Sequence, residues 1–184
     1  MRKRYSLLLV FALTSNALAQ GFLSYVVLDN HVGGLIDAPV FLPDCRTKVP
    51  AGRAYLAQGY VGLEPTLLKP EGLVVPFSTP GYIPSVGLVV PGTTLNPQQV
   101  FLQMRVWQAS AGSTFEAARD AGGLYGFSNV IPILARADQG PPEISIGLQS
   151  FCLIPEPETT TLLLVGLLYL GYISLRHRSK PRYR

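Results

Sequence analysis

The stretch VFLQMRVWQ, residues 100–108, is the strongest structural signal in this chain and decides the fold class that we expect. Every second residue of the stretch is apolar: Val100, Leu102, Met104 and Val106. The residues between them are mixed in character: Phe101, Gln103, Arg105 and Trp107. Because successive side chains of a strand point to opposite faces, this period of two predicts a half-buried antiparallel strand, apolar inward and mixed outward.

Short runs rich in Val, Leu, Ile, Tyr and Phe recur on both sides of this stretch, separated by Gly or Pro every eight to twelve residues. We expect strands at residues 22–28, 40–42, 53–61, 73–77, 86–90, 129–135 and 146–153. This spacing suggests a sandwich or a barrel, and we expect a mainly β protein with a single antiparallel β-sandwich-like domain. The segment from residue 20 to residue 154, roughly 135 residues, has the size of one ordinary domain.

One short helix is expected after the 100–108 strand. The pattern Ser113-x-x-Glu116 matches a capping box, in which a serine and a glutamate satisfy the first free N–H groups of a helix. Alanines follow the pattern, and Gly122-Gly123 supplies a stop. We therefore expect about two helical turns in this stretch.

The C-terminal part of the chain has the character of a membrane span. Residues 159–175 contain no charge and no proline. As a helix they would reach ~25 Å, slightly less than the ~30 Å hydrocarbon core of a bilayer. Basic residues beside a span stay on the cytoplasmic side, and five of them follow in the tail 176–184: Arg176, Arg178, Lys180, Arg182 and Arg184. We expect a transmembrane helix at about 159–175 with a cytoplasmic tail; a buried core helix is the alternative.

The N-terminal part matches an export signal. Three cations at residues 2–4 precede the apolar run 7–13. Ala17-Leu18-Ala19 is a small-x-small cleavage site, which predicts a signal peptide at 1–19 and a mature start at Gln20. An N-terminal membrane anchor that is never cut is the alternative.

Between the expected domain and the span stands Pro155-Glu156-Pro157. Each proline fixes its own φ and keeps the preceding residue out of the helical region, so this segment should be extended and rigid. Followed at once by a span and a basic tail, it resembles the PEP-CTERM sorting signal, and the resemblance covers residues 155–178 of the segment 155–184. It implies that an exosortase-type membrane enzyme of the kind found in many Gram-negative bacteria recognises the Pro-Glu-Pro. It further implies export through the inner membrane, retention by the span, and processing.

Stretches within the expected domain, at residues 37–41, 54–62, 105–118, 123–129 and 147–157, also resemble exported proteins that carry the same signal. That resemblance implies a shared β-rich architecture and no known activity. Cys45 and Cys152 are the only cysteines. Because export leads to an oxidising compartment, a disulfide between them is the natural interpretation, and two buried free thiols are the alternative.

The polar residues of the expected domain argue against catalysis and nucleic-acid binding. Residues 20–154 contain seven cations and nine carboxylates, so this part is mildly acidic although the chain carries +4. An acidic domain gives no electrostatic support to nucleic-acid binding. Its one histidine, His31, lies in a Gly-containing turn, and no Gly-x-Ser-x-Gly elbow is present. Glu116 and Asp120 share a helix face, but a cap and a solvated face explain them more simply than a hydrolytic pair.

Metal binding is not expected either. One histidine and two distant cysteines do not supply the ligands of a zinc site. Asp29, Asn30 and Asp37 are the nearest cluster for calcium, but they lack the dense Asp-x-Asp spacing. We therefore expect no catalytic residue, no metal and no cofactor.

The sequence thus predicts a protein of the cell surface or extracellular matrix that an exosortase-type enzyme sorts and that catalyses nothing itself. The alternative is a carbohydrate-binding module for exopolysaccharide, and an extracellular hydrolase is a third hypothesis. Six aromatic residues could stack on sugars if they are exposed: Tyr55, Tyr60, Tyr82, Trp107, Tyr125 and Phe127.

Overall fold

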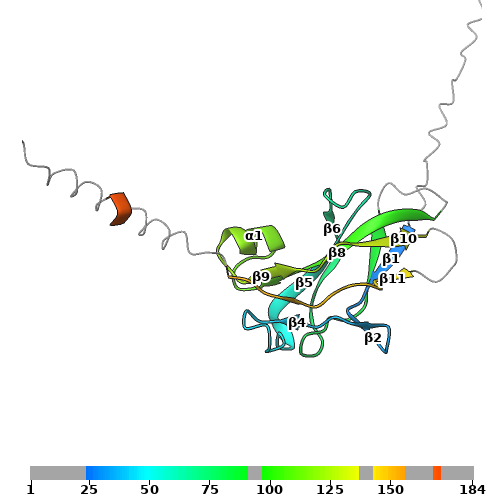
Figure 1. Ribbon diagram of the computed structural model, residues 1–184. Helices are drawn as coiled ribbons and strands as arrows, with labels where there is room; N and C mark the ends of the chain where they lie inside the picture. Colours follow the sequence, from blue (N-terminus) through cyan, green and yellow to red (C-terminus); the bar gives the residue numbers. More distant parts are fainter. Residues whose placement is uncertain (1–23, 91–96, 137–142, 156–167, 171–184) are drawn as a thin grey trace, which may run out of the picture.

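The computed structural model describes residues 24–90, 97–136, 143–155 and 168–170 (Figure 1). The strands are β1 (Ser24–Leu28), β2 (His31–Val32), β3 (Ile36–Asp37), β4 (Val40–Phe41), β5 (Gly52–Gly62), β6 (Lys69–Phe77), β7 (Val86–Val90), β8 (Gln98–Gln108), β9 (Tyr125–Phe127), β10 (Ile131–Ala135), β11 (Glu143–Ile144) and β12 (Phe151–Cys152). Helix α1 (Phe115–Asp120) lies between β8 and β9. The prediction of a mainly β protein is confirmed.

The two longest strands, β5 and β8, form the middle of the larger sheet. They pair antiparallel from Tyr55 opposite Gln108 to Gly62 opposite Phe101. Their sheet has the order β10-β8-β5-β6, with β9 also paired to β8, and a second sheet has the order β11-β1-β7. Two smaller pairs, β2-β3 and β4-β12, complete the strand pairing that is described.

The expectation of antiparallel pairing throughout is wrong at two places. β1 pairs parallel with β11, and β4 pairs parallel with β12. Parallel neighbours need a long connection rather than a hairpin, and both β11 and β12 come from the C-terminal part of the domain, far in sequence from their partners. The late strands thus join the sheets formed by early residues.

The single late strand expected at 146–153 is also wrong. The chain makes a turn there, with Gly147 at φ 95° and the N–H of Leu148 donating to the carbonyl of Ser145 over 3.2 Å. The Ser145 hydroxyl is buried and bonds the backbone of Asp29. This anchoring ends β11 at Ile144, and β12 begins only at Phe151.

The apolar face of β8 is confirmed as part of the core. Four of its side chains are fully buried: Val100, Leu102, Met104 and Val106. They share one cluster with residues of β1, β5, β7 and β10. The other face differs from the expectation, because Trp107 is also fully buried and packs with Tyr60, Phe115 and Ala118. α1 covers this end of β8, so the strand is buried on both faces there.

The helix begins one residue later than its capping box predicts. The N-cap is Thr114, whose hydroxyl accepts the N–H of Ala117 over 3.2 Å, and Ser113 has no such role. Glu116 therefore falls one position short of the box and contacts Tyr60 instead. The expected stop is confirmed, because Gly122 takes φ 75° after the C-cap.

Several predicted features lie outside the described residues: Ala17, Ala19, Gln20, Glu156, Pro157, Arg176, Arg178, Lys180, Arg182 and Arg184. Pro155 is described and exposed. Of the expected span, residues 168–170 are described, and they are helical and exposed. In the part of the chain that the structure describes, no helix combines the length and apolar character needed to cross a membrane.

Candidate functional site

A pocket of about 370 Å³ lies where five parts of the fold meet. β8 contributes Gln103 and Arg105, which point to one face because they are two residues apart. The remaining lining comes from the β5–β6 connection, α1, β9 and the residue before β10, with these side chains: Pro65, Thr66, Leu68, Phe115, Arg119, Tyr125, Phe127 and Val130.

Arg105 is held firmly at this pocket. Its guanidinium carbon lies 3.9 Å from the ring centroid of Tyr60 and 5.0 Å from that of Phe115. Its Nε donates to Oε1 of Gln103 over 2.9 Å, and its Nη1 lies 3.4 Å from Oε1 of Glu116. Cation–π contacts and a partly buried ion pair fix the guanidinium plane, and 22% of the side chain remains exposed to solvent.

Tyr60 contacts both members of the Arg105–Glu116 pair. Its side chain is buried, and its hydroxyl donates to Oε1 and Oε2 of Glu116 over 2.9 and 3.0 Å. Burial, and then the hydrogen bond to Glu116, raise the pKa of Tyr60 well above the ordinary value for tyrosine. Tyr60 therefore stays a neutral donor that orients the Glu116 carboxylate toward Arg105.

The two helix carboxylates have separate partners. Glu116 contacts Tyr60 and Arg105, whereas Asp120 accepts Nη2 of Arg119 over 2.8 Å. Asp120 is also the main reason that the pKa of Arg119 is raised. The geometry thus gives both carboxylates structural contacts, and the hydrolytic pair stays an unsupported hypothesis.

The rim of the pocket is aromatic. Tyr125 and Phe127 lie two residues apart on β9, so they share a face. The Tyr125 ring meets Phe115 edge-on with centroids 5.6 Å apart, and 50% of Phe127 is exposed. Of the six predicted stacking residues, Trp107 and Tyr60 are core residues, and the pair on β9 lines the pocket.

Two guanidinium groups line the pocket, and each is paired with a helix carboxylate just outside the lining, Arg105 with Glu116 and Arg119 with Asp120. Arg105 and Arg119 line it, and no carboxylate is among its described lining residues. A guanidinium has five N–H donors, and the contacts of Arg105 with Gln103 and Glu116 use two of them. The arrangement can bind a small anionic group beside an aromatic surface.

The aspartate cluster suggested for calcium has structural contacts instead. Asn30 is buried, and its amide donates to the carbonyls of Ala38 and Gly81 over 3.0 and 2.9 Å. Asp29 accepts the N–H of His31 and the hydroxyl of Ser85. Asp37 accepts the Tyr82 hydroxyl, and the Tyr82 ring lies 4.5 Å from that of His31. Among the described residues, no group of three or more His, Cys, Asp or Glu side chains could hold a metal ion.

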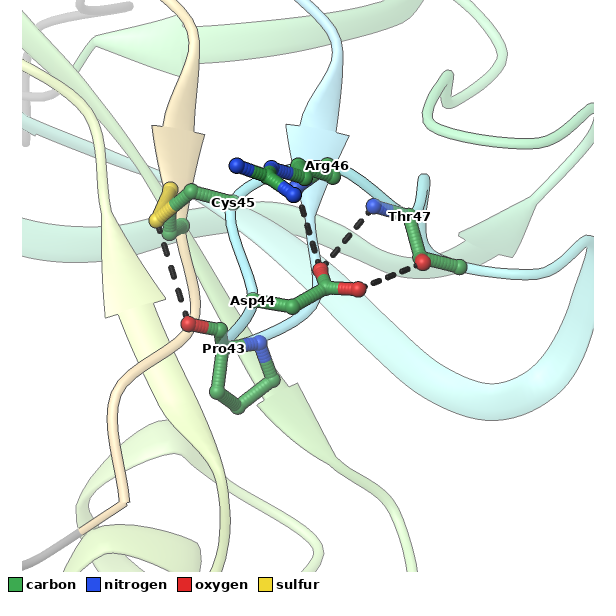
Figure 2. The surroundings of a disulfide bond; sticks show 6 residues. Pro43, Asp44, Cys45, Arg46 and Thr47 are labelled. Atoms are coloured by element: carbon green, nitrogen blue, oxygen red, sulfur yellow. Dashed lines mark hydrogen bonds between the residues drawn. A yellow bond between two sulfur atoms is a disulfide. The ribbon is translucent and has the colours of Figure 1, made fainter.

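Cys45 and Cys152, which are 107 positions apart in sequence, are joined by a disulfide with Cα atoms 5.2 Å apart. Figure 2 shows the bond beside the turn that follows β4. In this turn the Asp44 carboxylate accepts the N–H groups of Arg46 and Thr47 and the Thr47 hydroxyl over 3.0, 2.9 and 2.6 Å. The Thr47 hydroxyl is the largest of the causes that lower the pKa of Asp44 to about 2.

The chain is held firmly up to the residue that precedes Pro155. The N–H of Leu153 donates to the Phe41 carbonyl over 2.8 Å. Ile154 and Tyr125 exchange two backbone hydrogen bonds of 2.7 and 3.2 Å. Ile154, which directly precedes the Pro-Glu-Pro in sequence, is thus bonded to a residue that lines the pocket.

Sequence reasoning missed the pocket as a site. It noted Arg105, Tyr125 and Phe127 individually, but no pattern joined them to the loop residues Pro65 and Thr66. The signal that could have found it is the repeated i, i+2 spacing of polar and aromatic residues on β8 and β9. Comparison with protein-family models, curated proteins and solved structures found no match to this chain.

Proposed function

We propose that this chain is an exported surface or extracellular-matrix protein that an exosortase-type membrane enzyme sorts and processes. It is exported through the inner membrane, is held there by residues 159–175 with a cytoplasmic C-terminus before processing, and catalyses nothing itself. Its direct partners are the enzyme and the inner membrane, and nucleic acid is not among them.

The observation that carries this proposal is the order of features after β12. A disulfide and the backbone bonds of Leu153 and Ile154 fasten the chain. Pro155-Glu156-Pro157, an apolar run and a basic tail follow immediately. This order supports a processing motif presented at a fixed place beside a folded domain, with the span holding both at the membrane.

The exported part is proposed to be one β-sandwich-like domain. Its support is the shared core, in which buried residues from the β11-β1-β7 sheet and from the β10-β8-β5-β6 sheet form a single cluster. Two sheets that bury their apolar faces against one another make such a core.

The test of sorting replaces Pro155, Glu156 and Pro157 by Ala in a host that has the processing enzyme. The span is unchanged, so the variant should insert normally and stay uncut at full mature size in a blot of the membrane fraction. A matched control replaces three exposed residues of the preceding segment, Ile146, Gln149 and Ser150, by Ala and should be processed like the wild type. Release of the Pro-Glu-Pro variant at the wild-type rate would show that the motif is only a linker.

Carbohydrate binding, with exopolysaccharide as the ligand, is the second candidate function. One observation favours it: the half-exposed Phe127 beside the polar side chains of the pocket, an arrangement that could receive a sugar ring. Pull-down of the full chain with the host's polysaccharide tests it, and loss of binding in Phe127→Ala is the expected result. Equal retention of the wild type and Phe127→Ala would rule out carbohydrate binding through this pocket.

A further inference from the structure

We propose that the pocket around Arg105 and Arg119 binds the phosphate of anionic lipid headgroups and docks the folded domain on the bilayer to which it is tethered. This inference rests on the proposed function, because it requires residues 159–175 to span the membrane. It adds a ligand to the described domain itself.

The position of the pocket is the first argument. Ile154 pairs directly with Tyr125, whose side chain lines the pocket. Four residues, 155–158, separate Ile154 from the start of the expected span. Four residues reach at most ~14 Å even when fully extended. The β9 end of the domain must therefore stay close to the headgroup layer while the chain is tethered, and Figure 1 shows α1 and β9 together at this end.

The orientation of the side chains is the second argument. Residues directly opposite each other in paired strands point to the same face. Arg105 lies opposite Phe127, and Ile154 lies opposite Tyr125. The two outermost of these are exposed apolar residues, Phe127 at 50% and Ile154 at 46%. One face of the membrane-proximal end thus carries apolar side chains next to a guanidinium.

The chemistry of the lining is the third argument. Arg105 and Arg119 are its cations, and Thr66 adds a hydroxyl. Arginine binds phosphate oxygens with two parallel N–H groups, and an aromatic residue at the bilayer interface rests well beside headgroups. Arg119 donates Nε and Nη2 to one oxygen of Asp120, but both side chains are exposed to solvent, which weakens the pair and lets a phosphate compete for the guanidinium.

The consequence concerns processing. A domain docked through this pocket would hold Ile154 at a constant height above the bilayer, and the motif that follows would meet the membrane enzyme in one orientation. Without docking, the domain would swing about the short connection.

The experiment uses the full chain in lipid nanodiscs of phosphatidylcholine alone or with about a third phosphatidylglycerol. Phenylglyoxal modifies free guanidinium groups, and mass spectrometry reads each arginine separately. We expect modification of Arg119 to be about fivefold slower in the anionic discs, the effect of one cation held at an anionic surface. Arg136, which follows β10 at the opposite end of β8 from β9, is the internal control and should react equally in both discs.

Two variants test the face itself. Phe127→Ser should abolish the lipid-dependent protection of Arg119. Leu73→Ser changes a residue that is 75% exposed on β6 and should preserve it. Equal protection in all three proteins would overturn the proposal, because protection would then not depend on this face.

Further conditions of the same experiment distinguish the possible ligands. If inorganic phosphate or polygalacturonate protects Arg119 in phosphatidylcholine discs while phosphatidylglycerol does not, the pocket binds a free anion or an acidic saccharide and the lipid proposal is wrong. If the chain enters the discs but Arg119 reacts equally in both, this inference alone fails. If the chain does not enter discs, the membrane tether of the proposed function fails with it.

Discussion

At the scale of single residues, the most informative group is the trio of Tyr60, Arg105 and Glu116. The phenol donates to the carboxylate, the guanidinium pairs with the same carboxylate, and the guanidinium lies over the phenol ring. Each of the three residues thus contacts the other two, and together they hold the Arg105 guanidinium at the edge of the cluster that contains Trp107 and Phe115. This is why the mixed face of β8 can be largely covered without an isolated buried charge.

Replacing Tyr60 by Phe should destabilise the protein by about 1–2 kcal/mol at pH 8, because a hydrogen bond to a charged group is lost. The pKa of Tyr60 is raised above the ordinary value of 10.0. The folded state therefore keeps a proton that the unfolded state loses above pH 10, and this contribution to stability is present below pH 10 and declines as pH rises.

Urea denaturation of both proteins at pH 8 and at pH 11 measures the effect. The wild type should lose more stability than Tyr60→Phe over this interval, so the two midpoints should approach each other. Parallel loss in both proteins would contradict the role assigned to the phenol.

For Asp44 we predict the opposite pH dependence, a loss of stability as the pH falls. Its pKa is lowered from 3.8 to about 2, first by the Thr47 hydroxyl. The stability that it contributes is therefore fully present above pH 4 and is lost as the pH falls toward 2. In Asp44→Asn this loss should be absent, so the melting temperatures of variant and wild type should converge between pH 4 and pH 2. A constant difference across that range would show that the turn does not depend on the charge of Asp44.

At the scale of elements, the sequence predicted those strand faces that the alternation of apolar and polar residues determines. The apolar face of β8 was predicted residue by residue, because a strand with one buried face must alternate. β9 and β11 were not predicted, since two or three residues are too few for a period to appear, and their pairing depends on where β8 and β1 lie. The i, i+2 spacing on β8 and β9 marks two walls of the pocket, but its closure was beyond the sequence, because the β5–β6 connection and α1 close it from other parts of the chain.

The start of α1 offers a matched test at this scale. Thr114→Ala should cost about 1 kcal/mol, because it removes the cap that accepts the Ala117 N–H. Ser113→Ala, at the neighbouring position that the capping-box pattern selects, should change stability by less than about 0.5 kcal/mol. Chemical denaturation of both variants decides the register of the cap, and a larger effect at Ser113 would restore the capping box.

At the scale of the whole molecule, the disulfide connects the early turn after β4 with the last strand before Pro155. β12 pairs over only two residues with β4, and a pair of that size is marginal by itself. The bond between Cys45 and Cys152 closes a loop of 107 positions, which limits the unfolded chain and keeps β12 in register. The end of the domain thus depends on a covalent link more than on its few strand hydrogen bonds.

Cys152→Ser should therefore act in two ways. Loop closure of this length contributes ~4–5 kcal/mol by the chain-entropy argument, so the melting temperature should fall by roughly 10 °C or more. In addition, β12 should open locally, because only backbone hydrogen bonds, such as those of Leu153 and Ile154, then hold this end of the chain. Hydrogen exchange of the 151–154 amides should rise more than exchange in β8, and Cys45→Ser should reproduce both effects.

Wild type treated with reductant is the control without a mutation. Unchanged exchange at 151–154 after the bond is removed would mean that β4 pairing alone holds the end of the domain, and the presentation of the Pro-Glu-Pro would then not depend on oxidation.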